Sequence, residues 1–139
     1  MTRMRYFVVL ALAAVSVCAF GAGAAIASAD SASSPSGTFT VSVWYPDVVA
    51  VGTTATASET VTNTSSATET LTLTNTLTGS NGTAYSQTQV VTLAPGETFT
   101  QSYSTKVRRS DVGSYTLTFT ASDGSESATA VATFTVVKK

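Results

Sequence analysis

The residue types that most often carry enzyme chemistry are scarce in this chain. There is no histidine, and the single cysteine, Cys18, stands in an apolar N-terminal run. Catalysis needs a group whose proton or electron pair is available near the working pH, and these two side chains meet that need most often. The serines stand in Ser/Thr tracts without the flanking glycines of a nucleophile elbow. We therefore predict no catalytic residues and no enzyme.

Carboxylates are the remaining candidates for acid–base or metal chemistry. Glycoside hydrolysis needs two of them on one site, but they fall on separate turns and strand ends. Residues 123–126 read Asp-Gly-Ser-Glu, and loop carboxylates of this kind can bind Ca²⁺. A hairpin turn requires the same Asp-Gly pair, and two acids fall short of an EF-hand. We predict no metal and no cofactor, and whether Asp123 and Glu126 bind calcium stays open.

Three aromatic residues, Trp44, Tyr45 and Tyr85, are the candidate ligand-binding residues. Recognition of a sugar or polymer by a β-sandwich commonly uses exposed rings next to amides, and two glutamines follow Tyr85. Trp44 has the opposite parity to Val43, so its ring should project outward from the strand. The alternative is that Trp44 packs beneath the preceding segment or caps one end of the core.

A period of two in polarity predicts the elements that must position these residues. Leucines alternate with threonines between Glu69 and Thr78, which is typical of a strand with one buried face. No segment has apolar residues at helical spacing, so the pattern predicts an all-β sandwich. Seven strands are expected, near residues 38–45, 54–64, 69–78, 85–93, 98–107, 114–121 and 128–137.

Glu59 interrupts the otherwise apolar inward row of the second predicted strand. We interpret it as a residue at a β-bulge or at a sheet edge, where the alternation can slip. The threonine rows of the third, sixth and seventh strands should lie on one outer face if these strands share a sheet. Such rows are the surface chemistry of ice-binding proteins, although the twist of a sheet works against a flat lattice.

The N-terminus has the order of a secretory signal peptide. Arg3 and Arg5 precede an apolar run that ends in small residues, and we predict a signal peptide over residues 1–29, cleaved after Ala29. The alternatives are a retained membrane anchor and a lipidated Cys18. Residues 30–37 are expected to form a flexible leader and residues 38–139 the domain. Cleavage removes Cys18, so the exported domain has no disulfide. The signal peptide predicts that this domain is secreted or held at the cell envelope.

Charge excludes one class of partner. The exported part keeps all eight acids and five of the seven cations, which gives a net charge of −3. A nucleic-acid-binding protein usually carries a basic footprint, so we predict no nucleic-acid partner. We expect no membrane span after cleavage, and the oligomeric state stays open.

Three short motifs carry a resemblance over nearly the whole exported chain. They are Val-Thr-Asn-Thr-Ser at 61–65, Leu-Ala-Pro-Gly-Glu at 93–97 and Asp-Val-Gly-Ser-Tyr at 111–115. The chain resembles the immunoglobulin-like β-sandwich modules of bacterial secreted and cell-surface proteins, including the CARDB type. The resemblance implies a seven-stranded, immunoglobulin-like antiparallel β-sandwich, with Tyr115 closing a corner and Leu117 in the core. The missing disulfide and the place of Trp44 depart from the antibody-like branch.

Such sandwiches serve many roles, so the fold alone does not give the function. We expect a secreted, non-catalytic binding or structural module of the bacterial cell envelope or extracellular space, with a protein or polysaccharide partner at the cell surface. The alternatives are carbohydrate or wall-polymer binding through the Trp44 region, proteinase inhibition by the loop at residues 106–113, and ice binding through the Thr-x-Thr faces.

Overall fold

The computed structural model describes residues 27–139. The predicted signal peptide, apart from its last three residues, and its alternative at Cys18 therefore lie outside the described residues. The described part forms nine strands and one 3₁₀ turn, η1 (Arg109–Asp111). The strands are β1 (Ala27–Ser33), β2 (Phe39–Pro46), β3 (Val48–Ala50), β4 (Thr54–Asn63), β5 (Glu69–Gly79), β6 (Ala84–Leu93), β7 (Thr98–Lys106), β8 (Gly113–Ser122) and β9 (Ser127–Val137).

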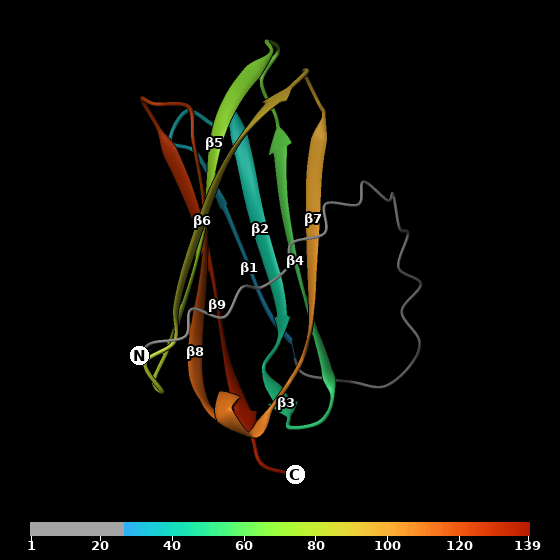
Figure 1. The fold of residues 1–139 in the computed structure, drawn as a ribbon. Coiled ribbons are helices and arrows are strands. Elements are labelled where there is room, and N and C mark those ends of the chain that lie inside the picture. Colours follow the sequence, from blue (N-terminus) through green and yellow to red (C-terminus); the bar gives the residue numbers. More distant parts are fainter. Residues whose placement is uncertain (1–26) are drawn as a thin grey trace.

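The strands form two layers, as Figure 1 shows. One sheet has the order β1-β2-β4-β7 and the other the order β3-β9-β8-β5-β6. All neighbouring strands are antiparallel except the short pair β3 and β9. The predicted immunoglobulin-like β-sandwich is confirmed, and each of the seven predicted strands is present. Among residues 27–139, no helix is long or apolar enough to cross a membrane.

Two of the nine strands were not predicted, and one of them replaces the predicted flexible leader. Residues 30–33 belong to β1, which pairs with β2, and a tight turn follows in which the Ser34 hydroxyl accepts hydrogen bonds from the backbone of Thr38 and Phe39. The prediction was wrong because it weighed only the small polar side chains. A sheet edge offers backbone hydrogen bonds whatever the side chains of the added strand.

The core consists of the inward rows that the alternation predicted. Its largest fully buried apolar side chains are Phe39, Leu71, Leu73 and Phe119, which come from both sheets. Burying a side chain of this size contributes about 1.5–3 kcal/mol, so these rows are the main source of stability in a domain without a disulfide. The whole core lies between residues 39 and 136, so we expect residues 27–139 to fold without the preceding segment.

The tyrosine corner implied by the resemblance is present. The Tyr115 hydroxyl donates a hydrogen bond to the Asp111 carbonyl (2.6 Å) and accepts one from Asn81 Nδ2 (2.8 Å). Gly79 leaves room for this ring, because a Cβ at that position would lie 2.6 Å from Tyr115 Cε1. Leu117 is buried in the core two residues further on.

Hydroxyl groups cover both outer faces of the sandwich. Strands β5, β8 and β9 are neighbours in one sheet, as expected, and their outward threonines face one another in register. Thr120 and Thr129 share a hydrogen bond (2.9 Å) on this sheet, as do Thr62 and Thr98 (2.9 Å) on the other. Threonine thus keeps these surfaces polar without charge.

Candidate functional site

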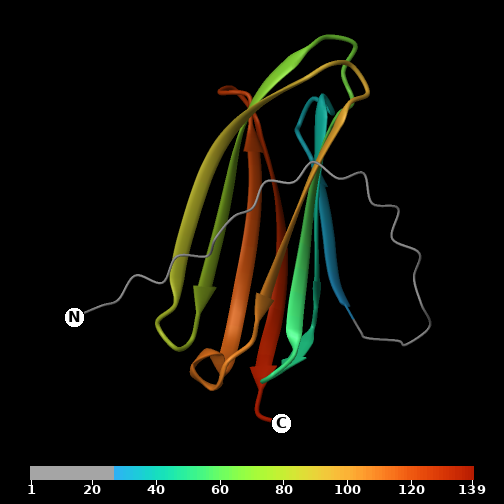
Figure 2. The same cartoon turned by 45° about the vertical axis from the view of Figure 1, so that its right-hand side comes forward.

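The sandwich is closed along one long side and open along the other. On the closed side β1 lies against β9, and Asp30 Oδ2 accepts a hydrogen bond from the backbone N–H of Val131 (2.9 Å). On the other side β6 and β7 are the end strands of the two sheets; they are not paired with each other, and the turn at residues 94–97 connects them (Figure 2). Gln89 Nε2 donates to Gln101 Oε1 across this opening.

A cleft of about 580 Å³ lies between the sheets on the open side. We call it the inter-sheet cleft. Its volume is in the range of small-molecule sites, and most of its wall is apolar. The residues used in the argument below are Tyr45, Asn75, Leu77, Tyr85, Tyr103 and Thr105.

Small residues explain why this space is not filled. The inward row of β4 begins with the small residues Ala55 and Ala57, which lie beyond the part of β4 that pairs with the valines of β2. On β7, the opposite inward positions are Tyr103 and Thr105, which are only half-buried. The two sheets therefore leave a gap where larger aliphatic side chains would have met.

Polar side chains occupy the same interior next to the cleft. Gln101 Nε2 donates to Glu59 Oε2 (2.7 Å). Three buried oxygen atoms make no hydrogen bond to the described residues, namely Glu59 Oε1, Asn75 Oδ1 and the Tyr103 hydroxyl. We call Glu59, Asn75, Gln101 and Tyr103 the polar cluster. Buried polar atoms are nearly always paired, so three unpaired ones beside a cleft make the polar cluster a candidate partner for a ligand group or for water.

The position of Glu59 corrects the sequence interpretation. Its side chain is 0% exposed, and β4 lies between β2 and β7 with unbroken pairing on both sides. Glu59 is therefore at neither a bulge nor an edge. The alternation does not slip, because the open side of the sandwich supplies polar partners to an inward carboxyl group.

Burial raises the pKa of Glu59 to about 7, although the hydrogen bond from Gln101 and the nearby Tyr103 hydroxyl favour the ionised form. The Tyr103 hydroxyl is close enough to influence the carboxyl group, yet the two make no hydrogen bond of good geometry. Burial, followed by the charge of Glu59, raises the pKa of Tyr103 as well. The polar cluster is thus neutral for the most part below pH 7 and has no cation to balance an ionised Glu59.

Two of the three predicted site residues line the cleft. Tyr45 is buried on the inner face of β2 and stacks on Phe134 with ring centroids 3.9 Å apart, and burial raises its pKa to about 12. Tyr85 is half-buried on the inner side of β6, and its hydroxyl donates to Gln87 Oε1 (2.6 Å). The structure therefore brings Tyr45 and Tyr85 to one site.

Trp44 lies elsewhere, on the outer face of β2. It is half-buried, and its register partners are Ala29 on β1 and Ser58 on β4. The prediction that its ring projects outward is confirmed, but Trp44 does not share a site with Tyr45 and Tyr85. Neighbouring side chains on a strand point to opposite faces of the sheet, so Trp44 and Tyr45 lie on opposite faces.

The sequence analysis did not identify Asn75 and Tyr103, and it misplaced Glu59. The sequence did contain an indication of this site, because Glu59 and Asn75 both stand at inward positions of strands whose other inward residues are apolar. Two polar interruptions on two strands indicate a shared interior site only if the strands face each other. That arrangement is decided by the packing of the sheets.

The turn at residues 123–126 uses its carboxylates within the protein. Asp123 Oδ1 accepts hydrogen bonds from the backbone N–H groups of Ser125 and Glu126, and these bonds lower its pKa. Glu126 Oε2 accepts from the Ser36 hydroxyl (2.6 Å). In the described part of the chain, no three acidic side chains come together as metal ligands.

A second hollow, of about 450 Å³, lies at one end of β8 and β9 beside Asp47. Its lining includes Thr116, Thr133 and Thr135, and none of the unpaired buried atoms belongs to it. The inter-sheet cleft is therefore the candidate site.

No protein-family model matches the chain, and no curated protein matches it. Among solved structures, the CARDB domain of a Pyrococcus furiosus protein, solved in complex with di-metal ions, is similar with a TM-score of 0.54 and 22% identity. The match covers 73% of this chain and 94% of that domain. This chain has a CARDB-like fold.

Part of a β-glucosidase from Listeria innocua, solved in complex with isofagomine, matches the CARDB-like sandwich as well. The TM-score is 0.52 with 16% identity, and the match covers 73% of this chain but only 16% of the enzyme. At these identities the likeness concerns the fold alone. The function must be argued from the residues of this chain.

Proposed function

We propose that this chain is a secreted, non-catalytic binding module whose ligand occupies the inter-sheet cleft. The observation that carries the proposal is an apolar cleft of about 580 Å³ beside three unpaired buried oxygen atoms. Pockets that combine apolar walls with a few convergent polar groups are typical binding sites for small ligands. The CARDB-like fold is compatible with this reading, because its two sheets provide a frame around the cleft.

The lining indicates the class of ligand. Leu77, the alanines of β4 and the tyrosine rings favour an apolar body. Asn75 Oδ1 can only accept a hydrogen bond, and Tyr103 and Asn75 both line the cleft. A ligand that places one hydrogen-bond donor against them would satisfy atoms that are now unpaired, which is worth about 1–3 kcal/mol for each group. We therefore propose a compact, mostly apolar ligand with one donor group.

Binding of Nile red, an uncharged apolar dye, tests the cleft. We expect saturable fluorescence with the folded protein, and about tenfold weaker binding for Thr105→Phe, a change of about 1.4 kcal/mol. Thr105 faces the cleft, so a phenylalanine there would fill its mouth.

The matched control is Ser104→Phe, which adds the same ring on the exposed outer face of the same strand. It should bind the dye as the unaltered protein does. Equal binding by both variants, or no binding by a folded protein, would contradict the proposal. Thermal unfolding curves should show that both variants are folded.

Secretion rests on the predicted signal peptide, and mass spectrometry of the protein from culture medium and washed cell envelopes tests it. We expect a soluble chain that begins at Asp30. Cleavage there removes three residues of β1 but leaves Asp30, which bonds to β9. An envelope-bound chain that keeps its first residues, or one that begins at a lipidated Cys18, would contradict release.

A further inference from the structure

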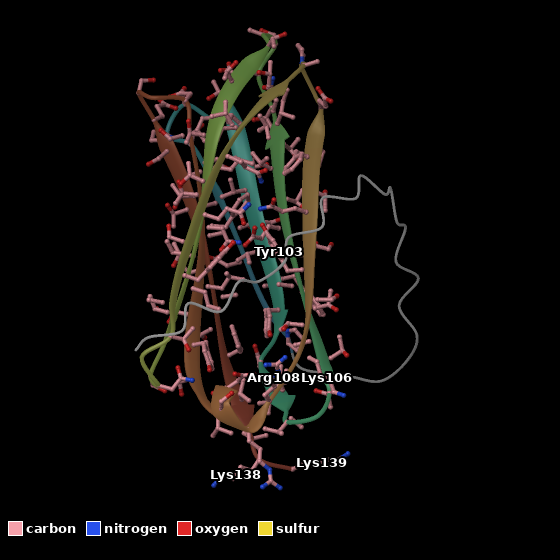
Figure 3. The ribbon with its side chains drawn as sticks, viewed as in Figure 1. Tyr103, Lys106, Arg108, Lys138 and Lys139 are labelled. Carbon is pink, nitrogen blue, oxygen red and sulfur yellow. The ribbon has the colours of Figure 1, made fainter. Side chains whose placement is uncertain are left out.

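The basic residues gather at one end of the molecule. Within residues 27–139 there are five, and they form what we call the basic end: Lys106, Arg108, Arg109, Lys138 and Lys139. Figure 3 labels four of them, all at the same end of the sandwich. Residues 51–52 hold the segments 106–109 and 137–139 near each other. The Gly52 N–H donates to the Val107 carbonyl (2.9 Å) and the Val51 N–H to the Val137 carbonyl (3.0 Å).

Most acidic residues lie far from the basic end. Glu69, Glu97, Asp123 and Glu126 stand at the opposite ends of the strands, and Asp30 lies midway along β1. The 11 residues of β5 span roughly 35 Å, whereas charges in physiological salt are screened over about 8 Å. The distant carboxylates therefore do not cancel the field of the basic end.

Two acids do lie near the basic end. They are Asp47, which follows β2, and Asp111, whose Oδ2 accepts a hydrogen bond from the backbone N–H of Arg108 (2.7 Å). Five cations against two carboxylates leave this end positive, although the described chain as a whole is negative. Charge is thus unevenly distributed, with a positive basic end, four acids at the opposite end and few charges on the hydroxyl-rich faces between them.

The chain also enters the domain at the basic end. Ala27, the first residue of β1, is in register with Pro46, the last residue of β2, and β2 ends beside the basic residues. In the sequence, the apolar run that contains residues 6–27 comes immediately before this point, after Arg3 and Arg5. While that run is held in a bilayer, the basic end is the part of the domain next to the lipid.

We propose that the basic end docks on an anionic phospholipid bilayer. A lysine or arginine close to such a surface strengthens binding by about fivefold. The faces of the sandwich carry no basic residue among residues 27–139 and give no competing attraction. The long axis of the domain would therefore lie along the membrane normal, with the acidic end away from the lipid. The proposal does not depend on the inter-sheet cleft, which the test below leaves unaltered.

Co-sedimentation of residues 27–139 with vesicles tests the docking, because the apolar run is then absent. One set of vesicles contains phosphatidylglycerol and phosphatidylcholine, and the other contains phosphatidylcholine alone. We expect binding to the first set only, with weaker binding at about 150 mM than at about 20 mM salt. Lys138→Gln with Lys139→Gln should weaken it by about 25-fold, fivefold for each charge.

A matched variant separates the basic end from net charge. Ser66→Glu with Thr68→Glu also lowers the net charge by two, but at exposed positions of the acidic end. It should bind vesicles like the unaltered protein. Equal weakening by the two double variants, equal binding to both kinds of vesicle, or no binding at low salt would overturn the proposal.

Two other partners would be recognised by the same charges. Binding to soluble polyphosphate without binding to vesicles would assign the basic end to a free polyanion and overturn docking on lipid. A third outcome is that the protein does not bind vesicles but forms oligomers at low salt, and that the lysine double variant does not. This outcome would assign the basic end to the acidic end of a second copy and overturn docking on lipid.

Discussion

Glu59 is a carboxylic acid in the interior of the domain. It is fully buried and has no basic neighbour among the polar cluster, and Gln101 is its hydrogen-bond donor. A carboxyl group in such a place is easier to bury protonated than ionised, which is why its pKa rises to about 7 from 4.5. The cluster is therefore a place where the stability of the domain depends on pH.

The sign of this dependence follows from proton linkage. Between about pH 4.5 and about pH 7 the folded state keeps a proton on Glu59 that the unfolded state has lost. The free energy of unfolding should therefore fall as the pH rises through this window, by about 3 kcal/mol at most, and level off above it.

Glu59→Gln should remove most of this slope and raise the Tm at about pH 8, because the amide carries no charge and can still accept the bond from Gln101. Thermal unfolding of both proteins between about pH 4 and about pH 9 measures the effect. Parallel pH profiles for the two proteins would show that Glu59 does not titrate in this window.

At the scale of elements, the tyrosine corner joins η1 to β8 and to the β5–β6 turn. One hydroxyl connects them, since Tyr115 donates to the Asp111 carbonyl and accepts from Asn81. This corner sits beneath Arg108 and Arg109, so it also holds part of the basic end in place. Two asparagine side chains link elements in a similar way: Asn81 Nδ2 also donates to the Ser110 carbonyl in η1, and Asn63 Nδ2 donates to the carbonyls of Ala67 and Leu93.

Tyr115→Phe should lower the free energy of unfolding by about 1–2 kcal/mol, because the part-buried Asp111 carbonyl loses its donor and Asn81 loses one of its acceptors. Urea denaturation measures the loss. Tyr85→Phe is the control, since it removes a hydroxyl on the half-buried edge strand β6 and should cost less. A larger loss for Tyr85→Phe than for Tyr115→Phe would contradict a structural role for the corner.

At the scale of the whole molecule, charge and polarity are separated in space. The two sheet faces carry hydroxyl rows, the five cations lie at one end, and four of the eight acids, Glu69, Glu97, Asp123 and Glu126, lie at the other. Threonine pairs across strands keep the faces polar, and each pair contributes about 0.2–1 kcal/mol to the stability of the sheet. The cleft opens along the side where β6 and β7 end their sheets. It reaches Val107 and Asp111 at the basic end, but none of the five basic residues lines it.

Ice binding, proteinase inhibition by residues 106–113 and polysaccharide binding through Trp44 stay predictions. The structure shows the threonine rows on one face, which ice binding requires, and a 3₁₀ turn in the loop. Neither observation favours these functions over binding in the cleft.

The sequence by itself determined seven of the strands, the buried rows and the outward position of Trp44, and its resemblance to immunoglobulin-like modules implied the corner at Tyr115. These features depend on alternation and turn residues within one stretch of chain. Only the tertiary structure decided that β1 and β3 are strands, that Glu59, Asn75 and Tyr103 meet, and that the cations share one end. Each of these features depends on which strands become neighbours. The alternation of polar and apolar residues does not give this information, because it is the same whichever strands pair.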